Sequence, residues 1–408
     1  MTDGELAQAR LHEIAEASLE GPGVTRLPWT REHRDANRLI GIWMKDAGLD
    51  VSLDAAGTLV GRSPNAGSKP LILLGSHQDS VRQGGRYDGI MGIALACLVA
   101  RRFRDRWSDL PVAISVLAFA DEEGVRFPTA LIGPRALAGT LDPSVFELAD
   151  ADGIRMSDAM RDFGLESERA SALAMRTPPV KAYLECHIEQ GPILEDNALP
   201  VGVVTGICGI TRIAVTFAGE TGHAGTVPMS GRRDALVGAA QFVDEVNRTV
   251  SNLSDLRATV GQFDVRPNVV NAIPNEVRLT LEIRGTDDVN RASFKQEMHQ
   301  VASRIANTAD LNLIWTPTYD QPAIACDAAL RRALAAGVRQ TGHRVLELPS
   351  GATHDSSAMA DLCPVGMLFV RCRNGVSHRP DEFASADDMA VAIDVCETAI
   401  RGIADQTE

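Results

Sequence analysis

Four short, predominantly apolar runs constrain the fold of this chain more than any other feature of its sequence. They span residues 71–74, 112–120, 182–186 and 367–370. Apolar runs without strict alternation are typical of strands buried on both faces, as in the parallel sheet of an α/β protein. In such sheets, ligands bind beyond the carboxyl ends of the strands. The runs therefore predict a fold class and also the place of a binding site.

Potential metal ligands lie close to the end of each run. His77, Glu123 and His187 follow the first three runs, His378 follows the fourth, and Asp88 lies eleven residues after His77. Imidazole and carboxylate groups in this combination suit a pair of sites for borderline cations such as Zn²⁺ or Mn²⁺, with one carboxylate able to bridge. A single histidine in such a place is more often an ordinary hydrogen-bonded group, and Asp88 alone could cap a helix. The prediction of a metal centre therefore rests on the five residues together.

The triplet Asp121-Glu122-Glu123 is difficult to explain as structure alone. Three adjacent carboxylates after an apolar strand repel one another unless cations or solvent compensate their charge. If Glu123 binds a cation, strand-like alternation points Glu122 elsewhere, where it can act as general base on a metal-bound water. A solvated loop is the alternative, and we favour the functional explanation.

Two residues near the predicted ligands have supporting roles. Asp79 lies two residues after His77, at a spacing that lets its carboxylate accept the second imidazole N–H and fix the tautomer of a metal-bound ring. Gln190, three residues after His187, offers an amide group to a substrate.

Composition and charge restrict the classes of partner. The 408 residues carry a net charge of −14, which disfavours nucleic acids and anionic membrane surfaces because both attract basic patches. A small molecule is the expected partner. The amino terminus lacks a basic segment followed by an apolar core, and the apolar stretch 90–100 is too short to span a bilayer. Seven scattered cysteines without a C-x-x-C pair fit a reducing compartment, so we expect a cytoplasmic protein.

Residues 209–322 follow a pattern of their own. The predicted elements are a strand at 212–217, a helix at 233–250, strands at 259–265 and 276–283, a helix at 289–306 and a strand at 311–316. This βαββαβ order is typical of a ferredoxin-like unit. We therefore predict an inserted domain at 209–322 and one catalytic domain formed by 1–208 and 323–408. Helices are expected in the latter at 5–20, 30–44 and 89–104, with short helices over 142–177.

Several longer strings point to a known family. GSHQDSVRQGGRYDGIMG, DEEGVRF, ECHIEQGP, GETGHAGTVPM and RNGVSHRPDE resemble the hydantoinase/carbamoylase branch of the di-metal amidohydrolases, which also include aminoacylases and glutamate carboxypeptidases. The likeness extends over nearly the whole chain. It implies a mostly parallel-sheet di-zinc hydrolase domain of the α/β class, with an inserted ferredoxin-like domain that acts as a lid and in dimerisation.

The resemblance also implies a role for each predicted ligand. His77 and His187 would bind one of two divalent metal ions, Glu123 and His378 would bind the other, and Asp88 would bridge both. Zn²⁺ or Mn²⁺ is expected, with Co²⁺ or Ni²⁺ also possible. Glu122 would be the general base.

Substrate contacts are implied as well. His223 would stabilise the developing oxyanion, often from the partner subunit of a homodimer, and Asn271 and Arg284 would hold the substrate carboxylate. The expected substrate-binding residues are Gln190, Arg212, Asn271, Arg284, Gly351 and His354. Without the family context, an ordinary loop histidine and a surface ion pair would explain His223 and Arg284 equally well.

Hydrolysis of a ureido C–N bond is the expected reaction, because His187 stands where the peptidase relatives usually carry an acid. An N-carbamoyl-L-amino acid is the first choice of substrate, with allantoate or 3-ureidopropionate as alternatives. An N-acyl amino acid hydrolase, a peptidase and a non-catalytic metal-binding protein are the rival functions. Thr353, Asn275 and Glu282 replace two glycines and an aspartate expected from the family, and these departures bear on the substrate.

Overall fold

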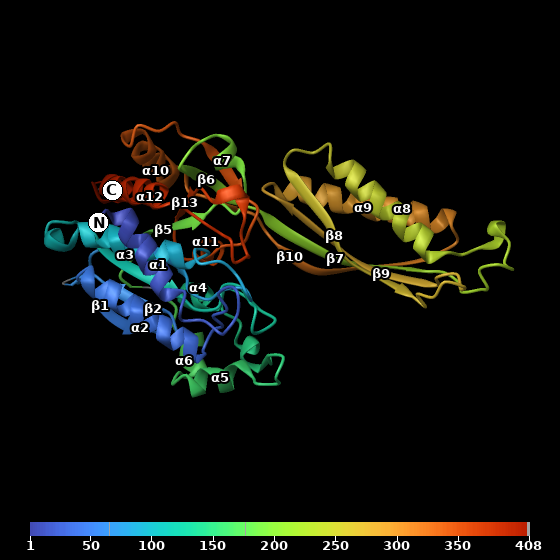
Figure 1. The fold of residues 1–408 in the computed structure, drawn as a ribbon, viewed down its shortest axis with the longest axis horizontal. Helices are drawn as coiled ribbons and strands as arrows, with labels where there is room; N and C mark the ends of the chain where they lie inside the picture. Colours follow the sequence, from blue (N-terminus) through green and yellow to red (C-terminus); the bar gives the residue numbers. More distant parts are fainter. Residues whose placement is uncertain (65, 176, 406–408) are drawn as a thin grey trace. The chain divides into compact units, whose positions relative to one another are not determined.

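The computed structural model describes residues 1–64, 66–175 and 177–405. It divides into two compact units, the first formed by Met1–Thr205 with Cys326–Glu408 and the second by Gly206–Ala325 (Figure 1). The division predicted from the sequence lies at 209 and 322, within three residues of these bounds. Each unit has a core of its own.

A nine-stranded mixed sheet forms the centre of the first unit. Its four inner strands are β4 (Ala113–Phe119), β3 (Leu71–His77), β5 (Val180–Ile188) and β13 (Val365–Val370), which lie side by side in this order. All three pairings among them are parallel. They correspond to the four apolar runs, so the prediction of a mostly parallel central sheet is confirmed.

Antiparallel strands flank this parallel centre, and the sequence analysis did not identify them. They are β1 (Asp50–Leu53), β2 (Leu59–Arg62), β6 (Val201–Ile207) and β11 (Ile324–Ala325). A further strand, β12 (Glu347–Ser350), pairs with β6 and was not identified either. β1 is largely exposed and β11 has two residues, so neither carries an apolar run.

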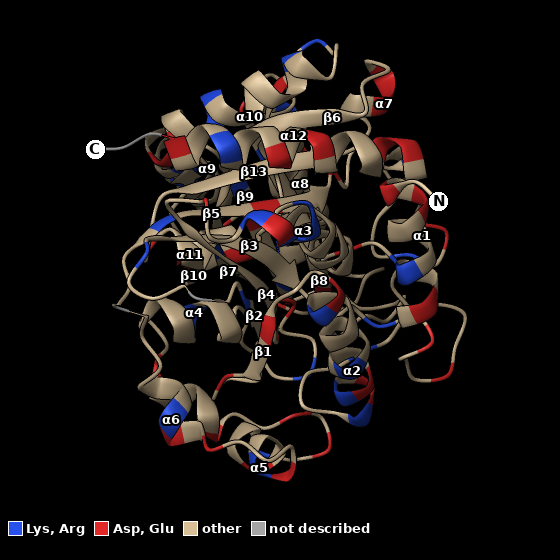
Figure 2. Ribbon diagram, turned by 90° about the vertical axis from the view of Figure 1, so that its left-hand side faces the viewer, with Lys and Arg blue, Asp and Glu red and all other residues tan. Residues whose placement is uncertain are grey.

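One face of the sheet is covered by long helices that share a single core with it. They are α1 (Asp3–Ile14), α2 (Arg31–Asp46), α3 (Ile90–Arg102), α10 (Ala328–Gln340) and α12 (Ala386–Asp405). α3 is apolar on all sides and is almost entirely buried. At its end, Arg101 and Arg102 pair with Asp3 on α1, and Arg102 also pairs with Asp394 and Glu397 on α12. Figure 2 shows acidic segments, coloured red, on both α1 and α12.

The first helix is shorter than predicted. The sequence analysis placed it at 5–20, whereas α1 ends at Ile14. The buried guanidinium of Arg26 donates to the carbonyl oxygens of Ile14 and Ala17, at 2.6 and 2.9 Å, and also to that of Gln78. A cation from the following loop thus binds the carbonyls at the end of the helix.

Short helices and connections complete the first unit. They are η1 (Arg104–Arg106), α4 (Ile132–Ala138), η2 (Pro143–Glu147), α5 (Met156–Asp162), α6 (Ser167–Ser171), α7 (Ile193–Asp196), α11 (Asp355–Met359) and η4 (Arg373–Gly375). The short helices expected over 142–177 are therefore present, apart from residue 176, which lies outside the described residues. They form a small core together with Trp29 and Phe127.

The second unit has the predicted βαββαβ order. Its elements are β7 (Gly209–Ala218), η3 (Met229–Gly231), α8 (Ala235–Val250), β8 (Leu256–Arg266), β9 (Glu276–Gly285), α9 (Asp288–Thr308) and β10 (Asn312–Gln321). The four strands form an antiparallel sheet in the order β10-β7-β9-β8. Both long helices share one core with this sheet, so its other face carries the half-exposed side chains Arg212, Glu282 and Arg284.

Within the described residues, none of the helices combines the length and the apolar character that crossing a membrane requires.

Candidate metal centre

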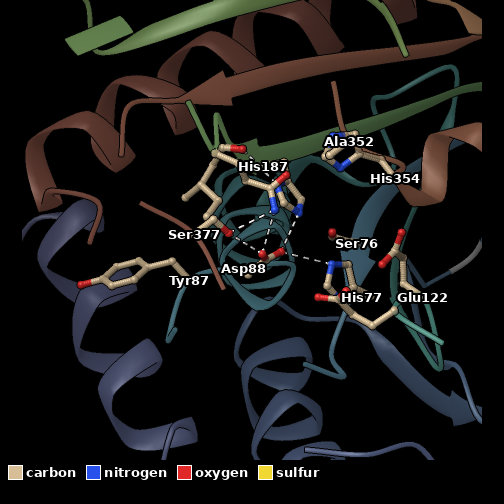
Figure 3. Close-up of polar contacts among 12 residues, drawn as sticks. Ser76, His77, Tyr87, Asp88, Glu122, His187, Ala352, His354 and Ser377 are labelled. Atoms are coloured by element: carbon tan, nitrogen blue, oxygen red, sulfur yellow. Dashed lines mark hydrogen bonds and ion pairs between the residues drawn. The ribbon is translucent and has the colours of Figure 1, made fainter. Parts of the chain in front are cut away.

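Three imidazole rings converge on the carboxylate of Asp88. The Nε2 atoms of His77 and His187 lie 3.5 and 3.1 Å from its Oδ1 atom, and Nε2 of His378 lies 3.3 Å from Oδ2. Figure 3 shows Asp88 between His187 and His77, with Glu122 beyond the His77 ring. The predicted ligands, although far apart in sequence, thus meet at one place.

The ligand atoms fall into three overlapping groups, in each of which all atoms lie within 4.8 Å of one another. The groups are His77-Asp88-His187, Asp88-Glu123-His378 and His77-Glu122-Glu123. Asp88 is common to the first two groups, so its two oxygens face two neighbouring positions. A carboxylate with this arrangement is suited to bridge a pair of cations.

The ends of the parallel strands explain this convergence. His77 is the last residue of β3, and His187 is the penultimate residue of β5, the strand beside it. Asp88 comes directly before Gly89, the N-cap of α3, which has φ 65°. A Cβ atom at Gly89 would lie 2.4 Å from the His77 ring, so only glycine allows this loop to approach the imidazole so closely.

The backbone carbonyl of Asp79, rather than its carboxylate, fixes the His77 ring. Nδ1 of His77 lies 3.0 Å from this carbonyl oxygen and 3.7 Å from the carboxylate atom Oδ1. The sequence analysis predicted a hydrogen bond from this imidazole to the Asp79 carboxylate, and that prediction named the wrong acceptor. The carboxylate instead accepts the backbone N–H groups of Glu122 and Glu123, at 3.0 and 3.1 Å. Asp79 thus orients both the imidazole and the acidic loop.

The second imidazole is fixed in the same way. Nδ1 of His187 lies 2.9 Å from the carbonyl oxygen of Ile188. With Nδ1–H donating to a carbonyl, the lone pair of each ring is on Nε2, the atom that faces Asp88.

The carboxylates change the pKa values of the imidazoles. Burial by itself lowers the pKa of His77, but Asp88 and Glu122 together raise it well above its usual value. The pKa of His187 is likewise raised by Asp88 against the effect of burial. His378 is half exposed, and its hydrogen bond with Asp88 raises its pKa to about 8.

The acidic loop shows the opposite effect. Burial raises the pKa of Glu122 well above its usual value, against the attraction of His77. Burial and the charge of Asp88 raise the pKa of Glu123 to about 7. The Glu123 Oε1 atom is buried and has no hydrogen-bond partner among the described residues. Burying neighbouring carboxylates costs free energy, and bound cations would compensate their charge.

Three further side chains contact Asp88 or its backbone. Gln190 donates to Oδ2 of Asp88 at 2.9 Å, and the hydroxyl of Ser377 lies 2.8 Å from the same oxygen. The carboxylate of Glu382 accepts the N–H of Asp88. Ser377 and Glu382 were not singled out from the sequence, although both lie in the string RNGVSHRPDE beside His378.

His354 also belongs to this region. Its ring centroid lies 4.4 Å from that of His187, and its Nε2 atom lies 2.7 Å from the Ser350 hydroxyl. Burial and the charge of His187 hold the pKa of His354 well below its usual value, so the ring is neutral. Gly351 lies in the same loop and is exposed.

The other predicted substrate contacts lie in the second unit. His223 and Asn271 are exposed on neighbouring loops, joined by a hydrogen bond from Ala224 N–H to the carbonyl of Asn271 at 3.0 Å. Arg212 and Arg284 both donate to the carboxylate of Glu282, at 2.6 and 2.8 Å. The potential metal ligands grouped around Asp88 therefore all belong to the first unit.

Known proteins similar to this chain are amidohydrolases. The profile of peptidase family M20/M25/M40 matches residues 73–402. An N-carbamoyl-L-amino acid amidohydrolase of Geobacillus stearothermophilus is 39% identical over 399 residues, which cover 97% of either chain. An allantoate deiminase of Arabidopsis thaliana is 37% identical over 418 residues, which cover 95% of this chain and 80% of the plant protein.

A solved structure matches over the full length. The crystal structure of an amidase of the hydantoinase/carbamoylase family from Burkholderia multivorans aligns with a TM-score of 0.92 and 32% identity, covering 100% of this chain and 99% of the other.

Cation binding should strengthen as the pH rises. A cation binds neutral imidazole, so it must displace the proton that His378 holds below a pKa of about 8. Titration calorimetry with Mn²⁺ between about pH 6 and pH 8 should show affinity rising by about tenfold per pH unit or more, because His77 and His187 also have raised pKa values. His378→Asn should reduce this slope, whereas a change of the exposed His12 to Asn should leave it unaltered. An affinity independent of pH would contradict the assignment of the imidazoles as ligands.

Proposed function

This chain belongs to peptidase family M20/M25/M40, and on that premise we propose that it is a metal-dependent amidohydrolase that cleaves the ureido C–N bond of an N-carbamoyl-L-amino acid. The observation that carries the proposal is the pair of ligand groups that share Asp88, with Glu122 at their edge. The 39% identity to an N-carbamoyl-L-amino acid amidohydrolase supports the choice of substrate.

Two divalent cations are proposed, each bound by residues of the first unit. His77 and His187 would hold one, Glu123 and His378 the other, and Asp88 both. The mixture of imidazole and carboxylate ligands favours Zn²⁺ or Mn²⁺, and Co²⁺ or Ni²⁺ would also fit. Bound there, the cations would polarise the ureido carbonyl and lower the pKa of water.

Glu122 is proposed as the general base. Its side chain is buried, and burial raises the pKa of its carboxyl group, which makes the carboxylate a stronger proton acceptor. Glu122 would accept a proton from the attacking water and deliver it to the departing nitrogen. Its backbone N–H donates to Asp79, which holds the loop in place.

The second unit would supply the remaining substrate contacts and close as a lid. His223 would donate to the carbonyl oxygen as negative charge develops on it, and Asn271 and Arg284 would hold the substrate carboxylate. Arg212, Gln190, Gly351 and His354 are further proposed contacts. Glu282 supports the anchoring role because it accepts from the Nε atom of Arg284 and so orients the guanidinium group.

A homodimer formed through the second unit is also proposed. β8 and β10 are the edges of its sheet, and edge strands offer unpaired backbone groups to another chain. Ile314 on β10 is 57% exposed, which suits a contact with a second copy. Sedimentation velocity tests this proposal, and a monomer at micromolar concentration would contradict it. We place the protein in the cytoplasm, in accord with its seven free cysteines.

Allantoate is the second candidate substrate, because the chain is 37% identical to an allantoate deiminase. A screen of N-carbamoyl-L-amino acids, allantoate, 3-ureidopropionate, N-acetyl amino acids and dipeptides with added Mn²⁺ or Zn²⁺ decides among them. Ammonia release from an N-carbamoyl amino acid is expected. Cleavage of the acetyl compounds or dipeptides alone would support an acylase or peptidase instead, and inactivity toward every compound would support a non-catalytic metal-binding protein.

Glu122→Gln should abolish turnover while both cations stay bound. The amide has nearly the same shape but cannot accept the proton, and loss of a general base lowers rates by about 10²–10⁴-fold. Steady-state kinetics and metal analysis of the same sample measure both effects. Glu123→Gln is the matched comparison, since it should weaken the binding of one cation. Wild-type turnover in Glu122→Gln would rule out the proposed base.

Arg284→Lys should weaken substrate binding more than catalysis. Lysine cannot form the bidentate pair with a carboxylate, so we expect KM to rise by about 10–100-fold with a smaller change in kcat. Arg278→Lys is the matched control, because Arg278 lies on the same strand and pairs with Glu276. Equal KM values for the two variants would contradict the anchoring role of Arg284.

A further inference from the structure

The carboxylate of Glu382 lies behind the metal centre. Glu382 is in the segment between β13 and α12, four residues after His378, and is 4% exposed. From its contacts we infer that Glu382 is a positioning residue that holds the bridging carboxylate of Asp88 and the His378 loop in the geometry for two cations. The inference rests on the proposed function, since it concerns the same centre.

One oxygen of Glu382 binds the backbone of the Asp88 loop. Its Oε1 atom accepts the N–H groups of Tyr87 and Asp88, both at 2.9 Å. Because hydrogen bonds are directional, two consecutive N–H groups that donate to one oxygen fix the direction of the peptide planes. The carboxylate therefore determines where the Asp88 side chain leaves the backbone.

The other oxygen connects the same residue to the His378 loop. The hydroxyl of Ser377 lies 3.1 Å from Oε2 of Glu382 and 2.8 Å from Oδ2 of Asp88. Ser377 is the neighbour of His378 in sequence, and Figure 3 shows its side chain directed at Asp88. Glu382, Ser377 and Asp88 thus close a ring of contacts that spans 294 residues of sequence.

The His378 loop needs such a support. His378 has φ 60°, a backbone conformation that residues other than glycine rarely adopt, and its side chain is half exposed. Packing alone therefore holds this ligand weakly. Its neighbour Ser377 provides the link to the buried Glu382.

Gly85 leaves the space that Glu382 occupies. A Cβ atom at position 85 would lie 2.3 Å from Oε1 and Cδ of Glu382, so any larger residue displaces the carboxylate. Gly85 and Glu382 are therefore in direct contact, and a substitution of either residue should weaken cation binding.

The test is cation binding by Glu382 variants, with substrate left out. Titration calorimetry with Mn²⁺ should show affinity reduced by about 10–100-fold in Glu382→Ala, the usual effect of removing an outer partner of a ligand. Glu382→Gln should restore it, because the amide oxygen accepts the same two N–H groups. Glu382→Asp keeps the charge but is one methylene shorter, and should bind as weakly as the alanine variant.

Absorption spectra with Co²⁺ separate positioning from general stability. The ligand-field bands of Co²⁺ should shift in Glu382→Ala and match the wild type in Glu382→Gln. Asp54→Ala is the matched control, because Asp54 also accepts two backbone N–H groups, those of Ala56 and Thr58, in the β1–β2 turn. It should leave both the isotherm and the spectrum unaltered.

Gly85→Ala provides an independent arm if the alanine variant at position 382 fails to fold. It should weaken Mn²⁺ binding while thermal unfolding in the presence of a chelator stays cooperative. Wild-type Mn²⁺ affinity and Co²⁺ spectra in Glu382→Ala, or in Gly85→Ala when the former is unfolded, would overturn the inference. If the wild-type protein hydrolysed no ureido compound, the proposed function would be contradicted, but the result of the cation-binding test would still stand.

Discussion

The attraction between one buried carboxylate and three imidazoles organises the first unit. Asp88 is 7% exposed and faces His77, His187 and His378, each within 3.5 Å. Glu122 and Glu123 lie close to the same group. Burying this many charges costs free energy unless opposite charges accompany them. The buried charges do not help to stabilise the fold, so we explain their arrangement by the binding of cations.

Carboxylates also hold the loops that carry the ligands. Asp79 accepts the N–H groups of Glu122 and Glu123, and Glu382 accepts those of Tyr87 and Asp88. In both cases two consecutive peptide groups point at an acidic side chain that is not among the grouped ligands. This pattern fixes the backbone on either side of the centre, so the ligand side chains have few conformations to lose on binding.

Much of the fold could be predicted because its central strands are buried on both faces. β3, β4, β5 and β13 need apolar side chains throughout, and the periodic pattern of the second unit follows from one buried face on each element. The flanking strands were missed for the opposite reason. β1 is exposed and short, so its pairing is decided by its neighbour β2 rather than by its own composition. The end of α1 was missed because the carbonyl of its last residue is bound by Arg26, twelve residues further along the chain, a contact that the local pattern does not show.

The sequence by itself determined which groups are available for chemistry, because acidic and imidazole side chains after buried strands have few structural explanations. Tertiary structure alone decided which atoms meet. The acceptor for His77 is the carbonyl of Asp79 and not its carboxylate, and the acceptor for the backbone N–H of Asp88 is Glu382, 294 residues away. Hydrogen bonds depend on distances of tenths of an ångström and on the direction of peptide planes. Residue spacing along a chain does not specify either quantity once loops of variable conformation lie between the residues.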